Sequence, residues 1–68
     1  MNQDTLDRNI RKFLKQVGIT SQAEIENAVQ AALASGQLSG NERLRVTLKL
    51  EIGDVGLLHQ LEGEIALE

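Results

Sequence analysis

His59 is the only histidine in the chain and the one side chain suited to proton transfer near neutral pH. It falls on the inward face of a predicted strand. A functional role there would be that of a proton shuttle or of a ligand in a pocket. The structural alternative is a histidine at the edge of the core whose ring is hydrogen-bonded to a backbone carbonyl, and we expect this alternative. A catalytic nucleophile needs a base beside it, whereas Ser21, Ser35 and Thr20 are expected at helix termini. We therefore predict that the chain is not an enzyme.

No metal or cofactor site is predicted. Glu62 and Glu64 project from one strand face and would hold a cation weakly, but pairing with Lys49 and Arg45 is the simpler expectation. Asp54 lacks the run of oxygen ligands that a calcium loop needs. The six glycines show neither dinucleotide-binding nor phosphate-loop spacing.

Basic residues offer the clearest candidate interaction surface. Four of them follow each other at helical spacing and are called the basic stripe: Arg8, Arg11, Lys12 and Lys15. Three more lie on the outer face of a predicted strand: Arg43, Arg45 and Lys49. The basic stripe could contact phosphates or an acidic partner, or could be an ordinary solvated face. Seven bases against ten acids give a net charge of -3, which disfavours nucleic acid as the partner.

Composition predicts one small domain over residues 1–68 with a thin core. The absence of cysteine fits a reducing cytosol, and no apolar run resembles a signal peptide or a membrane span. We therefore expect a cytoplasmic protein that does not contact membranes. A core this small rarely contributes more than about 3–5 kcal/mol to the free energy of unfolding. Self-association would therefore add stability that the single chain lacks.

The first half of the chain predicts two helices, at about 4–17 and 21–35. Gly18 is expected to end the first in a left-handed conformation, with Ile19 packing back as in a Schellman motif. Ser21 and Glu24 resemble a capping box that starts the second helix. Each helix has one apolar face. The first carries Leu6, Ile10, Phe13, Leu14 and Val17, and the second carries Ile25, Ala28, Val29, Ala32 and Leu33.

The second half predicts a β-hairpin, because apolar residues alternate from Leu44 onward. Strands are expected at about 43–52 and 57–67, joined by a turn at 53–56. A single antiparallel register pairs the inward-facing residues of the two strands with one another and places bases near acids on the outer face. It pairs Ile52 with Leu57, Leu50 with His59, Leu48 with Leu61, Val46 with Gly63, Leu44 with Ile65 and Arg45 with Glu64, and it sets Lys49 diagonal to Glu62. The expected fold is α+β, with two helices followed by an antiparallel two-stranded hairpin (ααββ) in two layers.

Two helices before a hairpin also resemble the core of a winged-helix domain. With Gly18 as the turn glycine, however, Glu24 falls where an apolar residue is expected. The second helix also carries Glu24 and Glu26 but no lysine or arginine, which disfavours a phosphate-lined groove. A degenerate helix-turn-helix nucleic-acid binder is therefore the alternative function.

The segments 11–22 and 63–68, together with Gly56-Leu57 and His59, resemble a family of short bacterial proteins of unknown function. This resemblance covers nearly the whole chain and implies that Leu67-Glu68 is native. It implies no activity, ligand or site.

The leading hypothesis is a small interaction module with an unknown protein partner, in particular one that associates with itself. A two-stranded hairpin has two unpaired edges, and no proline blunts them here. We expect a homodimer through the hairpin edge, in which Arg43, Arg45 or Lys49 meets Glu62 or Glu64 of the second copy.

Overall fold

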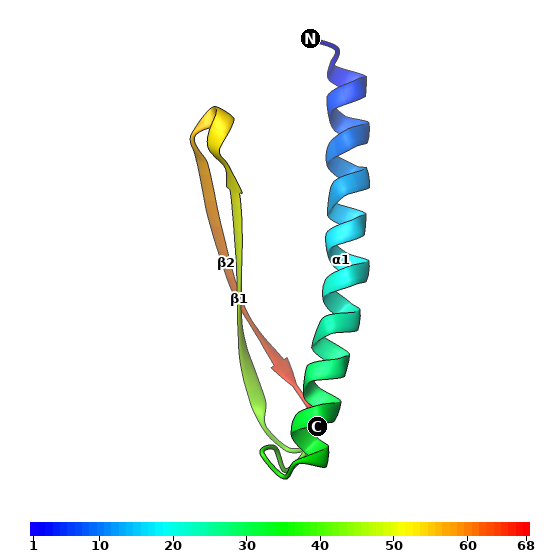
Figure 1. Ribbon diagram of the computed structural model, residues 1–68. Helices are drawn as coiled ribbons and strands as arrows, with labels where there is room; N and C mark the ends of the chain where they lie inside the picture. Colours follow the sequence, from blue (N-terminus) through cyan, green and yellow to red (C-terminus); the bar gives the residue numbers. More distant parts are fainter. The chain divides into compact units, whose positions relative to one another are not determined.

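The computed structural model describes all residues, Met1–Glu68, as one helix followed by a hairpin (Figure 1). The helix α1 spans Gln3–Ala34 and the strands β1 and β2 span Arg43–Ile52 and Leu57–Ala66. Between the strands lies a short 3-10 turn, η1, at Gly53–Val55. The chain divides into two compact units, Met1–Gln37 with the helix and Leu38–Glu68 with the hairpin.

The prediction of two helices is wrong, because α1 runs without a break through residues 18–21. The architecture is αββ and not ααββ. Gly18 does not take the left-handed conformation expected of a helix terminator, since positive φ occurs only at Gly36, Gly40 and Gly56. Ser21 lies inside the helix and caps nothing, and Ile19 is exposed instead of packing back.

Weak local signals explain why the helix continues past Gly18. A glycine inside a helix costs only about 1 kcal/mol relative to alanine, and no proline forces a stop. The hydroxyl of Thr20 donates to the carbonyl of Gln16 at 2.8 Å, so it is satisfied within the helix. The apolar spacing also keeps its phase across Gly18, from Val17 to Ile25.

The true ends of α1 carry the expected capping groups. The side chain of Asn2 accepts a hydrogen bond from the Thr5 N–H at 3.0 Å, which is the usual N-cap contact. At the other end Gly36 has φ +82, and its N–H donates to the Leu33 carbonyl at 3.2 Å. A left-handed glycine after the last turn is the common way to end a helix.

The hairpin forms as its alternating sequence predicts. All six predicted cross-strand pairs are confirmed, from Ile52 with Leu57 at the turn to Leu44 with Ile65 at the open end. Strand β1 has the predicted bounds and β2 ends one residue early, although the Leu67 N–H still donates to the Glu42 carbonyl at 3.0 Å. At the turn, Gly56 has φ +65 and its N–H donates to the Gly53 carbonyl at 3.2 Å.

Neither unit buries a side chain by itself. A single helix cannot cover its own apolar face, and a two-stranded sheet cannot cover its own apolar side. Side chains expected in a core are therefore at best half-buried, as Val17, Val29 and Leu44 are. Each unit is amphipathic and has no closed core of its own.

Candidate functional site

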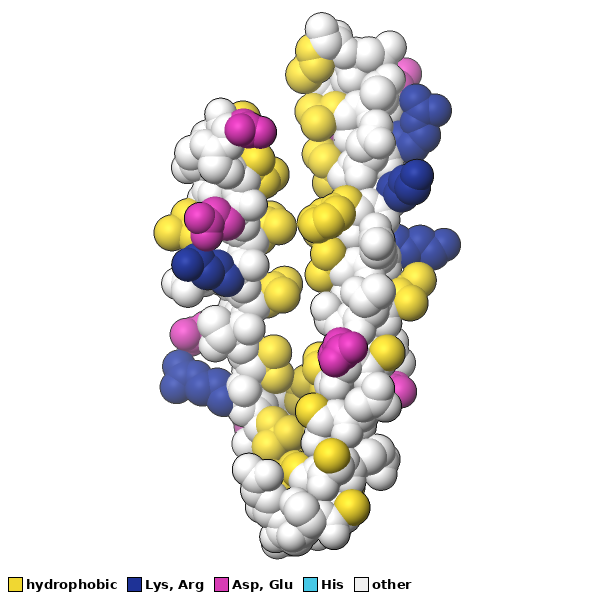
Figure 2. Space-filling view, in the orientation of Figure 1, with side chains coloured by type: hydrophobic (Ala, Val, Ile, Leu, Met, Phe, Trp, Pro, Cys, Tyr) yellow, Lys and Arg dark blue, Asp and Glu magenta, His cyan; other side chains and the backbone are white.

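One face of α1 is apolar along most of its length and is the largest candidate site. We call it the apolar stripe, and it consists of Leu6, Ile10, Phe13, Leu14, Val17, Ile25, Ala28, Val29, Ala32 and Leu33. Figure 2 shows hydrophobic side chains gathered along one side of the helix. Phe13 is 54% exposed and Leu14 is 50% exposed. An exposed apolar surface of this extent, bordered by polar residues, is typical of an interaction site.

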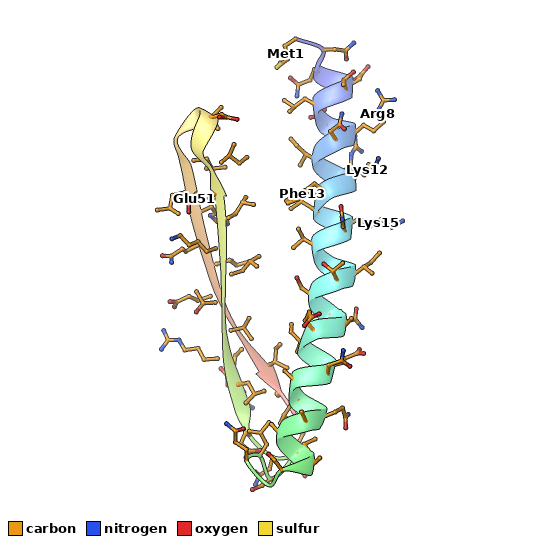
Figure 3. The ribbon with its side chains drawn as sticks, in the orientation of Figure 1. Met1, Arg8, Lys12, Phe13, Lys15 and Glu51 are labelled. Carbon is orange, nitrogen blue, oxygen red and sulfur yellow. The ribbon has the colours of Figure 1, made fainter.

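The basic stripe lies on α1, largely on the side away from the apolar stripe. In Figure 3 Arg8, Lys12 and Lys15 point away from Phe13. Because α1 is one helix, these four residues lie in its N-terminal half and far from its C-terminal end. They therefore do not complement a C-terminal dipole. None of the four forms an ion pair, and Arg11 only donates through Nε to the Asp7 carbonyl at 3.3 Å.

The three basic residues of the hairpin are already paired within it. Arg45 reaches Glu62 at 3.1 Å, Arg43 reaches Glu64 at 3.6 Å and Lys49 reaches Glu51 at 3.7 Å. Arg45 stands opposite Glu64 in the register as predicted, but its ion pair is with Glu62 on the diagonal. The expected Lys49–Glu62 contact is absent. Two of these ion pairs join the strands, whereas the pair of Lys49 and Glu51 lies within β1.

Glu42 closes a small backbone cradle that the sequence analysis missed. Its carboxylate accepts hydrogen bonds from the N–H groups of Ser39 at 2.7 Å, Gly40 at 2.9 Å and Asn41 at 3.2 Å. These donors, Ser39 foremost, hold the pKa of the Glu42 carboxyl below its ordinary value. Such a cradle would suit an external anion, but the chain's own carboxylate fills it. The sequence feature that could have indicated this cradle is the run of small residues, Ser39-Gly40-Asn41, directly before Glu42.

His59 stands opposite Leu50 on the hairpin and is exposed. It makes no side-chain hydrogen bond and no ion pair, so the predicted bond to a backbone carbonyl is absent. No nucleophile or carboxylate is hydrogen-bonded to it. The sequence placed it on the correct strand position, but a two-stranded sheet does not enclose it.

Acidic groups and surface hollows do not assemble into a site. No three residues among histidine, cysteine, aspartate and glutamate come close enough to hold a metal ion. An open hollow on α1 is lined by Asn2, Asp4, Thr5, Arg8 and Arg11, and one on the hairpin lies among its ion-paired residues. In both, acids and bases line the same depression and no apolar wall is present. Neither has the enclosed apolar form of a ligand pocket.

Comparison with known proteins identifies a family. A family of unknown function, DUF6494, matches residues 1–68. The chain belongs to DUF6494. The resemblance noted in the sequence is thereby confirmed, and it covers the helix and the hairpin of this DUF6494 member together. No curated protein and no solved structure is similar to the chain. It has no helix that combines the length and the apolar character needed to cross a membrane.

Proposed function

We propose that this chain is a non-enzymatic interaction module that associates with copies of itself. The observation that supports the proposal most is that neither amphipathic unit buries a side chain by itself. The side chains that could take part in catalysis do not gather in one place, and several make local contacts instead. Glu42 binds the backbone of its own loop, and the charged residues of the hairpin pair with one another. The apolar stripe of α1 is the largest apolar surface that its own unit leaves uncovered.

Each unit by itself is only marginally stable. Isolated helices draw little stability from propensity alone, and a lone two-stranded hairpin is marginal in water. Both gain stability only when their apolar faces are covered. Covering apolar surface contributes roughly 25 cal/mol per Å², which is the main source of association energy in such modules. A second copy is available wherever the chain is made.

The hairpin edges offer one route to self-association. Each strand has one neighbour only, so each leaves a row of unpaired backbone groups. The charge matching we expected there has less support now, because Arg43, Arg45 and Lys49 are paired within the same hairpin. An edge dimer would rest on backbone hydrogen bonds alone.

The helix-turn-helix alternative loses its geometric basis. That motif needs a turn between two helices, and α1 is continuous at Gly18 where the turn was expected. The net charge of -3 gives no attraction to a phosphate backbone. We expect the module to act in the bacterial cytoplasm, as its composition and family resemblance predict.

Analytical ultracentrifugation tests the proposal. Sedimentation equilibrium from about one to about one hundred micromolar should give an average mass that rises with concentration, because self-association follows mass action. The melting temperature should rise over the same range. A single species near 7.5 kDa that does not change with concentration would reject the proposal.

A further inference from the structure

No carboxylate of the chain pairs with the basic stripe of α1. Its four side chains are all exposed, and none of them forms an ion pair. The three basic residues of the hairpin, by contrast, each pair with a glutamate. Every unpaired lysine and arginine of the chain therefore lies in one short stretch on one side of α1.

The basic stripe repels itself. Arg8 and Lys12 are four residues apart, and Arg11 and Lys15 are separated in the same way. Like charges at this spacing are neighbours on the helix surface and destabilise the helix. The helix dipole does not compensate for this cost, because the four bases lie in the N-terminal half of α1 and the dipole favours bases near the C-terminus. A charged cluster that costs stability and has no partner inside the chain points to a partner outside it.

The positive patch is short and has a sharp limit. From Arg8 to Lys15 it extends about 10 Å along the helix axis. Glu26 lies on the same side of α1, eleven residues or about three turns beyond Lys15. The whole of α1 carries four bases and four acids, so its formal charges cancel. A long polyanion lying along this side of the helix would therefore meet an acid as well as the bases.

The N-terminal end of the basic stripe borders the open hollow on α1. Arg8 and Arg11 line this hollow together with Asn2, Asp4 and Thr5. Each guanidinium group presents a planar fork of donors that fits a carboxylate. Asp4 is the one acid in the hollow, and it does not pair with either arginine. An incoming carboxylate would find both guanidinium groups free but would be repelled by Asp4.

We propose that the basic stripe binds an acidic surface of another protein, whose carboxylates extend over about 10 Å, as on two turns of one helix face. This contact is separate from whatever covers the apolar stripe, because Arg8, Lys12 and Lys15 point away from Phe13 in Figure 3. It does not require self-association. The partner neutralises the four bases and so relieves their mutual repulsion.

Nucleic acids and membranes fit the basic stripe less well. Both present negative charge over a much larger extent than the patch, and that charge would also meet Glu24 and Glu26 on the same helix. The net charge of the chain is -3, whereas nucleic-acid binders carry a basic footprint. Phe13, the only aromatic residue, lies on the apolar stripe and cannot stack on a nucleobase beside the four bases.

A synthetic acidic helix tests the proposal. The probe is an alanine-rich peptide with four glutamates at positions i, i+3, i+4 and i+7, and its control has glutamine at the same positions. Isothermal titration calorimetry at low salt should detect binding of the glutamate peptide only. Added salt should weaken this binding, because ions screen exposed charges. If the glutamate peptide does not bind at a concentration of about one millimolar, the proposal is wrong.

Paired variants locate the contact. Arg11→Gln/Lys12→Gln removes two of the four bases and should weaken the Kd of the glutamate peptide about tenfold. The matched control, Arg43→Gln/Arg45→Gln, removes the same charge from the hairpin, where both bases already pair with glutamates, and should leave Kd unchanged. Equal weakening by both variants would mean that net charge alone attracts the peptide, and it would overturn the assignment to the basic stripe.

Asp4→Asn tests the hollow in the opposite direction. It removes the one acid that faces Arg8 and Arg11, so it should tighten the Kd of the glutamate peptide about twofold. Loss of folding cannot produce such a gain. A Kd that does not tighten would mean that the acidic partner does not reach these two arginines, and it would overturn their part in the contact.

Further measurements separate this contact from the self-association proposed above. A chain that stays monomeric but binds the glutamate peptide through the basic stripe keeps the contact and loses self-association. If Arg11→Gln/Lys12→Gln abolishes self-association, a second copy is the occupant and the acidic partner is overturned. Tighter binding of duplex DNA or of phosphatidylserine vesicles than of the peptide, lost in the same variant, would also overturn it. Circular dichroism of each variant checks that α1 remains helical.

Discussion

The carboxylate of Glu42 accepts a hydrogen bond from the backbone N–H of Ser39 at 2.7 Å, and this contact stabilises the loop that leads into β1. Gly40 and Asn41 donate to the same carboxylate. The backbone carbonyl of Glu42 accepts from the Leu67 N–H at 3.0 Å at the open end of the hairpin. One residue therefore connects the loop to both strands, through its side chain and its main chain.

This arrangement predicts an acid-sensitive hairpin. The donors favour the charged carboxylate, so the folded-state pKa of Glu42 lies below its ordinary value of 4.5. A lowered folded-state pKa contributes stability that is fully present above the unfolded-state value and is lost as pH falls through the folded value. The melting temperature, followed by circular dichroism, should hold above about pH 5 and decline below it. Glu42→Gln should flatten that decline.

Glu51→Gln is the matched control. It removes a carboxylate of β1 whose ion-pair contact is Lys49 at 3.7 Å on the exposed face. It should leave the acid decline of the wild type in place. An NMR titration that gives the Glu42 carboxyl an ordinary or raised pKa would contradict the account.

Two glycines of the helical unit should respond to alanine in opposite ways. Gly18 lies inside α1 without positive φ and a Cβ there would meet nothing within 4 Å, so Gly18→Ala should stabilise by about 1 kcal/mol. Gly36 has the same open space but φ +82, so Gly36→Ala should cost about 1 kcal/mol. Urea unfolding measures both. A loss of stability on Gly18→Ala would indicate a turn at that position and contradict the single helix.

The sequence predicted the hairpin well because each face of it carries its own constraint on the register. The alternation from Leu44 to Ile52 and the charges on the outer face both select one register. The helix was mispredicted because Gly18 and Ser21 are good terminator and cap residues in isolation. Each such preference is worth only about 1 kcal/mol. The apolar residues before Gly18, Leu14 and Val17, and those after it, Ile25 and Ala28, share one helix face, which a single continuous helix explains.

The sequence predicted the positions of the candidate site residues better than it predicted their contacts. Arg45 and Lys49 lie on the predicted outer face, but spacing does not give the side-chain conformations that choose their partners. Arg45 reaches diagonally to Glu62 on β2, and Lys49 pairs with Glu51 on its own strand. The role of Glu42 depends on backbone geometry at Ser39 and Gly40, where Gly40 has φ 105. Periodicity carries no information about loops of this kind.

The basic stripe should contribute little to the stability of α1. Lys12 and Lys15 make no ion pair or hydrogen bond, so Lys12→Gln and Lys15→Gln should each change the free energy of unfolding by less than about 0.5 kcal/mol. Thermal melting at one fixed protein concentration measures this. Ile10→Gln, which changes the apolar stripe of the same helix turn, should cost clearly more. If Lys12→Gln unfolded the protein, the polar and apolar sides of α1 would have been assigned wrongly.

Gly63 stands opposite Val46 at the centre of the hairpin and offers a test of what lies on that face. Its φ is not positive and a Cβ would meet nothing within 4 Å, so a branched side chain fits the strand. Gly63→Val should stabilise the hairpin by about 1 kcal/mol, through strand propensity and the new contact with Val46. Gly56→Val, the same change at φ +65, should destabilise it. A destabilising Gly63→Val, measured by urea unfolding, would mean that another side chain presses against this glycine and that the apolar face of the hairpin is covered there.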